Sequence, residues 1–301
     1  MTAIAPERPY PGLADYSLLL LLAALWGGSF TFIKIGVETV PSLTLTAMRL
    51  VIATATLLLF ARLAGERVIP DRRLWPAVLA AGITGNALPF ALISWGEEHI
   101  DSGLAAILMG VMPLATVIIA HFVTSDEKLD LRKIVGVLLG LAGLVVLIGP
   151  EKLLTLGGDV PRQLAVAGAS LCYAVNANIT RTLTRAPPRG TVAAVLLVST
   201  VIMVPISLLV DRPMSLSPSL ASMLSIVTLG IVQTGIATLM LFEIVRRQGA
   251  SFFSQINYLV PIAGVVWGAI VLGERVPPSA YAALALILLG VAIAKRRRAK
   301  R

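Results

Sequence analysis

The chain of 301 residues is 57% hydrophobic and only 14% charged, with a formal net charge of +9. Its mean hydropathy is +0.88, whereas soluble domains are roughly half apolar and about a quarter charged. The composition therefore excludes a water-soluble globular protein and predicts a protein embedded in a membrane.

Windows long enough to cross a bilayer follow one another along the chain. A hydrocarbon core about 30 Å thick takes about 20 helical residues. The windows are residues 16–33, 42–61, 74–96, 102–125, 134–150, 163–180, 190–210, 213–242, 248–273 and 276–294, of which only the second contains a charge, Arg49. They predict an all-α integral membrane protein with ten transmembrane helices, and they leave no room for a soluble catalytic or DNA-binding domain.

The basic residues are distributed unevenly between the two sides of this predicted bundle. With a cytoplasmic N-terminus, the cytoplasmic tails and loops hold 19 Lys and Arg residues and the opposite side holds five. Cytoplasmic loops of membrane proteins carry such an excess, so we expect both terminal tails, residues 1–14 and 296–301, to be cytoplasmic. The basic C-terminal tail is then an anchor to lipid headgroups, and no nucleic acid is expected among the partners.

The two halves of the chain match each other at one register. A shift of 148 residues aligns Pro113 with Pro261, Asp126 with Glu274 and span with span. Each half, residues 15–150 and 162–295, has five spans, so the second half enters the membrane from the opposite side, with residues 151–161 as the linker. Inverted repeats of this kind place equivalent residues of both halves near the membrane midplane.

Helix kinks are expected at three prolines within the spans, Pro89, Pro113 and Pro261. Proline removes one helical hydrogen bond, and the freed carbonyl is costly in lipid. The matched pair Pro113 and Pro261 is therefore predicted to face a central cavity. Packing kinks without a ligand role are the alternative.

Polar and aromatic side chains inside the spans are the candidate substrate contacts, because an unpaired amide costs roughly 2 to 7 kcal/mol when it is buried. They lie at matched depths in both halves. The candidates are Trp26, Ser29, Phe30, Asn86, Ser94, Tyr173, Asn176, Thr180, Gln233, Ser254, Asn257 and Tyr258. Hydrogen bonding between helices is the alternative role for each of them.

No Asp, Glu or Lys lies at mid-span beside these candidates. They predict a polar, uncharged, aromatic-lined site for a neutral or zwitterionic small molecule with an apolar side chain. The site lacks ligands for a polyanion or a metal ion, and no cofactor is expected. Arg49 is interpreted as a structural charge that snorkels or bonds to loop carbonyls, with contact to a substrate carboxylate as the alternative.

Several segments resemble the drug/metabolite transporter superfamily, whose ten-span members carry two copies of a five-helix EamA domain. These segments are "LWGGSFTFIKIG" at residues 25–36, "PSLTLTAMRL" at 41–50 and "YLVPIAGVVWGAIVLGERVPPSAYAALALILLGVAI" at 258–293. The first copy departs from the pattern at Asp126 and Glu127, where the family has Gly-Glu.

The resemblance implies a substrate site between the halves, lined mainly by the first four helices of each repeat, with the fifth and tenth helices peripheral. The likeness is greatest to bacterial exporters of amino acids and related metabolites, and an aromatic amino acid is the expected substrate. It implies a transporter, not an enzyme, in the bacterial inner membrane, which exports amino acids with aromatic or apolar side chains by alternating access. The partners are then a small-molecule substrate and the lipid bilayer, and the chain is a monomer or a weak dimer.

Three other functions can be distinguished from the hypothesis of an amino-acid exporter. A broad-specificity drug or organic-cation exporter on the same fold would be favoured by an acidic residue at mid-depth, which the spans lack. An intramembrane enzyme needs an Asp pair, an HExxH motif or an Asp-rich prenyl-phosphate motif, and none occurs. A scaffold that transports nothing would leave the midplane amides without a role. For the coupling, downhill exchange or facilitated diffusion is an equal alternative to proton antiport.

Overall fold

The computed structural model describes residues 10–66, 68, 71–123, 129–148, 159–183 and 187–295. Within these ranges the protein is helical and has no β-strand, as the sequence predicts. The elements are α1 (Leu13–Val37), α2 (Ser42–Leu63), η1 (Arg72–Leu74), α3 (Trp75–Gly82), η2 (Ile83–Ala87), α4 (Leu88–Glu97), α5 (Ser102–Met109), α6 (Met112–Val123), α7 (Leu131–Ile148), α9 (Val160–Ile179), η3 (Thr180–Leu183), α10 (Pro188–Val210), η4 (Pro213–Ser215), α11 (Leu220–Thr228), η5 (Leu229–Ile236), α12 (Ala237–Phe253), α13 (Ile256–Val271) and α14 (Pro278–Lys295). Asp126, Glu127 and most residues assigned to the two tails and the linker lie outside the described ranges.

Six helical stretches among the described residues are long and apolar enough to cross a membrane. They are Leu13–Val37, Ser42–Leu63, Arg72–Glu97, Ser102–Ile119, Arg189–Val210 and Leu220–Gly249. Two shorter apolar helices follow, Ile256–Val271 and Pro278–Ala294, and the two remaining predicted windows are occupied by α7 and α9. The protein is therefore a multi-pass membrane protein.

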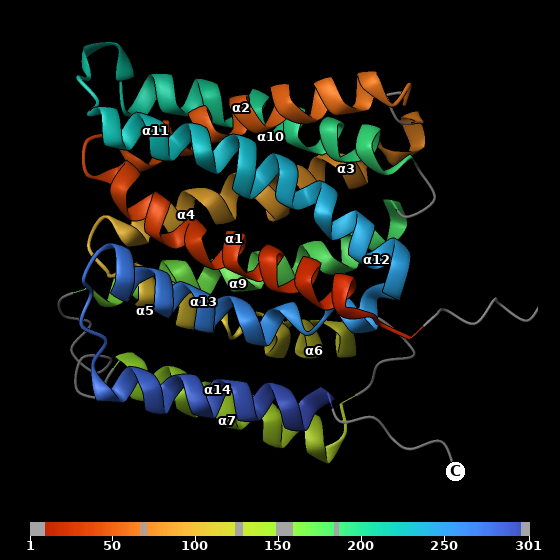
Figure 1. Ribbon diagram of the computed structural model, residues 1–301, viewed down its shortest axis with the longest axis vertical. Helices are drawn as coiled ribbons and strands as arrows, with labels where there is room; N and C mark the ends of the chain where they lie inside the picture. Colours follow the sequence, from red (N-terminus) through yellow and green to blue (C-terminus); the bar gives the residue numbers. More distant parts are fainter. Residues whose placement is uncertain are drawn as a thin grey trace, which may run out of the picture.

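The helices run side by side in one bundle (Figure 1). α2 and α10 lie together at one edge of the view and α7 and α14 at the other, with α1, α9 and α13 between them. α1 begins and α14 ends at the same end of the bundle (Figure 1). The chain therefore crosses the bundle an even number of times.

Two of the long spans contain a widened helical turn at the same register. The π-helical segment η2 separates α3 from α4, and the π-helical segment η5 separates α11 from α12. The shift of 148 residues that aligns the halves places Ile83–Ala87 within Leu229–Ile236. π-helical turns are rare and occur often at functional sites. The repeat thus carries a shared local distortion as well as a shared order of spans.

Helices from the two halves pack against each other through the middle of the bundle. α1 packs along α13, α2 packs against α10 and η5, and α4 packs against α9. The largest buried cluster lies at these contacts and includes Phe30, Ile107 and Val265. The space at the centre of the protein is therefore bordered by both halves.

α7 and α14 pack against each other at the edge of the bundle (Figure 1). Their backbones approach closely, since a Cβ added at Gly136 would lie 2.5 Å from the carbonyl oxygen of Gly290 and 2.8 Å from the Cβ of Ala294. Small residues allow two membrane helices to come this close. The fifth span therefore presents a small-residue packing face, and α14 covers this face.

Candidate functional site

A cavity of about 400 Å³ lies between the two halves. Its first-half wall comes from α1, α2, η2, α4, α5 and α6, and its second-half wall comes from α9, η5, α12 and α13. The lining residues are Trp26, Ser29, Phe30, Ile33, Arg49, Gly85, Asn86, Phe90, Ile93, Met109, Met112, Tyr173, Asn176, Ala177, Gln233, Thr234, Thr238, Leu241, Phe253, Ile256, Asn257, Val260 and Pro261. None of them lies on α7, α10, α11 or α14.

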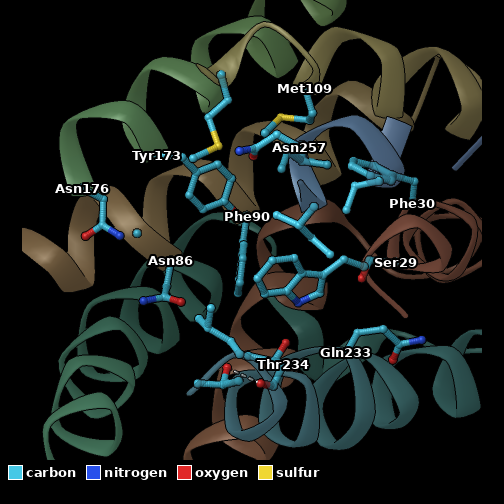
Figure 2. Close-up of a pocket in the computed structure, with 18 of the residues that line it drawn as sticks. Ser29, Phe30, Asn86, Phe90, Met109, Tyr173, Asn176, Gln233, Thr234 and Asn257 are labelled. Carbon is cyan, nitrogen blue, oxygen red and sulfur yellow. Dashed lines mark hydrogen bonds between the residues drawn. The ribbon is translucent and has the colours of Figure 1, made fainter. Parts of the chain in front are cut away.

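Aromatic and sulfur-containing side chains form much of this wall. Phe90 from α4, Tyr173 from α9 and Met109 from α5 converge on the cavity (Figure 2). Trp26 of α1 meets Phe253 of α12 edge to face, with ring centroids 6.0 Å apart. Flat rings and adaptable thioethers provide apolar surface for a ligand side chain of similar size.

Four amide side chains, from Asn86, Asn176, Gln233 and Asn257, line the same cavity. Figure 2 shows Asn176 and Gln233 on opposite sides of it. The amide nitrogen of Asn257 donates to the carbonyl oxygen of Ser254 at 3.1 Å. The carbonyl oxygens of Asn176 and Gln233 are buried and have no hydrogen-bond partner among the described residues. A buried acceptor without a donor costs about 1–3 kcal/mol, and the carbonyl oxygen of Asn178, which does not line the cavity, is in the same situation.

Asn176 reaches the cavity because residue 85 is a glycine. A Cβ at Gly85 would lie 2.7 Å from the Nδ2 atom of Asn176. The π-helical turn η2 thus brings its backbone directly against an amide of the other half. A larger residue at position 85 would push the Asn176 amide away from this wall.

Among the described residues that line the cavity, Arg49 is the one that carries a charge. Its side chain is buried, at 5% exposure. Its Nε atom donates to the Thr234 hydroxyl at 2.9 Å, and its guanidinium carbon lies 3.8 Å from the centre of the Phe90 ring. The structure holds the guanidinium between α4 and η5 at the cavity, and not at loop carbonyls, so both a structural role and contact with a substrate carboxylate stay predictions.

The structure brings eight of the twelve candidate contacts to the cavity: Trp26, Ser29, Phe30, Asn86, Tyr173, Asn176, Gln233 and Asn257. The other four lie elsewhere. Ser94 is fully buried beside Thr46, whose hydroxyl donates to it at 3.4 Å, and the Thr180 hydroxyl donates to its own helix at the Asn176 carbonyl. Ser254 and Tyr258 share the α13 end of the site but do not line the cavity.

The three prolines occupy different local positions. Pro261 lies inside α13 and lines the cavity. Pro113 is buried in the first turn of α6, and Pro89 follows η2 in the first turn of α4, and neither lines the cavity. The expectation that Pro113 and Pro261 face the cavity equally is therefore wrong for Pro113. Its neighbour Met112 takes that place on the wall.

Two copies of one family pattern cover most of this chain. The EamA-like transporter family matches residues 14–149 and residues 162–295. The chain belongs to the EamA-like transporter family. It is accordingly a transporter and not an enzyme.

Named relatives of this EamA-like transporter match nearly its whole length. The "Uncharacterized inner membrane transporter YedA" of Escherichia coli (strain K12) is 26% identical over 282 residues, 92% of this chain and 89% of that protein. The "Probable terminal-alkyne amino-acid exporter" of Streptantibioticus cattleyicolor is 27% identical over 284 residues, 93% of this chain and 92% of that protein. One solved crystal structure, 23% identical in sequence, aligns with a TM-score of 0.67 over 94% of this chain and 97% of that chain, and so has the same fold.

Several lining residues of the EamA-like transporter were not singled out from its sequence, among them Met109, Met112 and Thr234. Thr234 carried a usable signal, because the shift of 148 residues pairs it with Asn86. Met109 and Met112 could not be singled out from the sequence, since apolar residues in an apolar span have no distinguishing pattern. They face the cavity because the fourth span breaks between α5 and α6.

Proposed function

We propose that this EamA-like transporter exports amino acids with aromatic or apolar side chains. The observation that carries the proposal is the composition of the cavity wall, where amides and aromatic rings from both halves surround about 400 Å³. Pockets of about 300–1,000 Å³ with mainly apolar walls and a few placed polar groups are typical of small-molecule sites. Rings and methionines contact the side chain of the substrate, and amides and Arg49 contact its polar end.

Alternating access between two inverted five-helix repeats is the proposed mechanism. The matched π-helical turns η2 and η5 support it, because each lies in the cavity wall and widens a helix at the equivalent position of its repeat. Helical segments can tilt relative to each other at such turns. We infer that the segments on either side of η2 and η5 rock in turn, so that the cavity opens to one face of the membrane at a time.

The proposed membrane arrangement has ten spans in the bacterial inner membrane with both termini cytoplasmic. The shared position of the two chain ends (Figure 1) supports an even number of crossings. The name of the E. coli relative supports the inner membrane, and the excess of basic residues in alternate loops supports cytoplasmic ends.

The charge of the wall argues against a drug or organic-cation exporter. Among the described residues no Asp or Glu lines the cavity, and the one charged lining residue is Arg49. A buried cation repels a cationic substrate at close range in a medium of low dielectric constant. The name of the Streptantibioticus relative supports an amino acid as the substrate instead.

Reconstitution in liposomes tests this function. Liposomes loaded with radiolabelled phenylalanine, leucine, glutamate or lysine are followed for efflux, with and without a pH gradient. We expect phenylalanine and leucine to leave faster than from protein-free liposomes, and glutamate and lysine not to. Acceleration by an opposing proton gradient would assign antiport, and equal rates would assign downhill transport.

A paired variant ties that efflux to the cavity. Ala177→Trp places an indole in the wall, whereas Leu171→Trp on the same helix replaces a side chain that is 54% exposed at the bundle surface. We expect Ala177→Trp to abolish phenylalanine efflux and Leu171→Trp to retain it. Equal efflux from both variants, or efflux of none of the amino acids by the unmodified protein, would refute the proposal.

A further inference from the structure

Arg49 is held in a fixed orientation by residues of both halves. Its Nε atom donates to Thr234 of η5, in the second half, at 2.9 Å. The Phe90 ring of α4, in the first half, lies 3.8 Å from the guanidinium carbon. These two contacts constrain the plane of the guanidinium, and no hydrogen bond joins its Nη1 or Nη2 group to another described residue.

No described carboxylate pairs with Arg49. The ion pairs of the described residues join Arg162 to Glu98, Arg189 to Glu66, Arg246 to Glu243, and Arg247 to Glu243 and Asp15. Glu97 interacts with Arg49 electrostatically but lies beyond the 4 Å distance of a salt bridge. A buried charge is normally paired and fully hydrogen-bonded, because an unpaired one is costly.

The second repeat has no equivalent of this cation. The register of 148 residues pairs Arg49 with Leu197, which is 40% exposed at the surface of the bundle, and pairs Thr234 with Asn86. A charge required by the packing of the repeat would be expected in both copies. Arg49 is therefore a point at which the two repeats differ, and it lies in the cavity wall.

We propose that Arg49 is the carboxylate-binding residue of the cavity, so that the transporter recognises substrates by a free carboxylate group. The inference rests on the proposed function, because it names the substrate group that the same site takes. The two free Nη groups form a planar fork that matches the two oxygens of a carboxylate. Gln233, adjacent to Thr234 along the chain, lines the same cavity and is the amide that we assign to the ammonium group of the same substrate.

Arg162 provides a matched control within the same protein. Its guanidinium carbon lies 3.9 Å from the centre of the Trp95 ring, which resembles the geometry of Arg49 on Phe90. It differs in having a protein partner, since its Nη1 atom is 2.5 Å from the Glu98 carboxylate. It also lies outside the cavity lining. Loss of Arg162 thus removes an aromatic-stacked arginine without removing the free cation.

The test measures equilibrium binding of three labelled probes to the purified protein in lipid nanodiscs. L-Phenylalanine has both a carboxylate and an ammonium group, L-phenylalaninamide lacks the carboxylate, and 3-phenylpropionate lacks the ammonium group. We expect the unmodified protein to bind phenylalanine about tenfold or more tightly than phenylalaninamide, since a charge-assisted bidentate pair is worth more than 1.4 kcal/mol. Arg49→Gln should remove this ratio, and Arg162→Gln should retain it.

A second variant keeps the test decisive where Arg49→Gln does not fold. Thr234→Val removes the acceptor of the Nε hydrogen bond and keeps the cation. We expect it to lower the ratio by about threefold to tenfold, because the fork is no longer held in place. A ratio unchanged in both variants, or phenylalanine and phenylalaninamide weakened equally, would overturn the carboxylate assignment.

The outcomes separate this inference from the proposed function. If phenylalanine binds and is exported while Arg49→Gln keeps the ratio, the carboxylate site is overturned and the amino-acid exporter stands. If 3-phenylpropionate binds as tightly as phenylalanine in an Arg49-dependent way, the carboxylate site stands and the amino-acid assignment is overturned. If the unmodified protein binds phenylalaninamide as tightly as phenylalanine, the carboxylate assignment is overturned.

Discussion

The Glu274 carboxylate caps the N-terminus of helix α5 at Ser102, a residue 172 positions earlier in the chain. One carboxylate oxygen accepts the backbone N–H of Ser102 at 2.8 Å, and the other accepts the N–H of Gly103 at 2.9 Å and the Ser102 hydroxyl at 3.1 Å. The first N–H groups of a helix have no partner inside it, and a negative charge there is favoured by the helix dipole. A residue of the second repeat thereby completes a helix of the first.

Loss of this cap is expected to weaken the junction of the two halves. Glu274→Ala should lower the free energy of unfolding by about 1.5–3 kcal/mol, the usual range for hydrogen bonds to a charged group. The measurement is unfolding in mixed micelles with increasing sodium dodecyl sulfate. Glu243→Ala is the control, because its ion pairs with Arg246 and Arg247 are solvent-exposed and should contribute less than about 1 kcal/mol. Equal effects of the two variants would contradict the prediction.

Asn176 and Asn178 lie two residues apart on α9 but differ in their relation to the cavity. Asn176 lines it, whereas the Asn178 amide donates to the Ala174 carbonyl of its own helix at 3.1 Å. We expect Asn176→Ala to lower the rate of phenylalanine efflux about tenfold through the lost ligand hydrogen bond. Asn178→Ala should leave the rate nearly unchanged at the same expression level. If neither variant changed the rate, the cavity amides would be structural contacts between helices.

Substitution by alanine is expected to change the free energy of unfolding in opposite directions at Gly136 and at Gly168. A Cβ at Gly136 would lie 2.5 Å from the carbonyl oxygen of Gly290, whereas at Gly168 the nearest atom, Cδ1 of Leu92, is 3.9 Å away. Gly136→Ala should destabilise the protein by about 1–3 kcal/mol through overpacking. Gly168→Ala should be neutral or stabilising by up to about 1 kcal/mol, since alanine is the better helix former.

The Gly136→Ala variant also tests whether the packing of α7 against α14 affects stability without affecting transport. α7 and α14 contribute no lining residue among those described, so the folded fraction of Gly136→Ala should keep the KM of the unmodified protein. The measurement is efflux at increasing substrate concentration after correction for the amount of folded protein. A raised KM would show that the edge pair of helices shapes the cavity.

The proposed topology predicts which positions are reached from outside the cell. In a Cys172→Ala background, which removes the one cysteine of the chain, Ser215→Cys and Ala299→Cys are labelled with a membrane-impermeant maleimide. Ser215 lies in η4, at the end of the bundle opposite the start of α1. We expect labelling of Ser215→Cys in cells with a permeabilised outer membrane, and of Ala299→Cys only after lysis. The reverse pattern would place both termini outside.

The helical class and the doubled family pattern were predictable from the sequence for a simple reason. A bilayer leaves backbone groups no partner but each other, so each long apolar window must be helical whatever its neighbours are. The register between the repeats was also predictable from the sequence, because Pro113 and Pro261 lie at equivalent positions within their spans. The same register pairs the two π-helical turns, but nothing in the sequence predicted that these segments are π-helical.

The cavity was predictable only in part. Asn176 and Gln233 were found because a polar residue in an apolar span is conspicuous. Ser94 and Thr180 gave the same signal but are satisfied within the helices, by Thr46 and by the carbonyl of Asn176. A span pattern shows that a polar group needs a partner, and it does not show whether the partner is another helix or a ligand.

The sequence by itself determined the class of protein, the order of its spans and its membership of a transporter family, because these depend on apolar length and on local motifs. Only the tertiary structure decided the state of Arg49. Its partners Phe90 and Thr234 are 41 and 185 residues away along the chain, and no pattern within one span specifies them. Packing of α2 against α4 and η5 turns the guanidinium into the cavity, which converts a charge that the sequence assigned to structure into a candidate binding group.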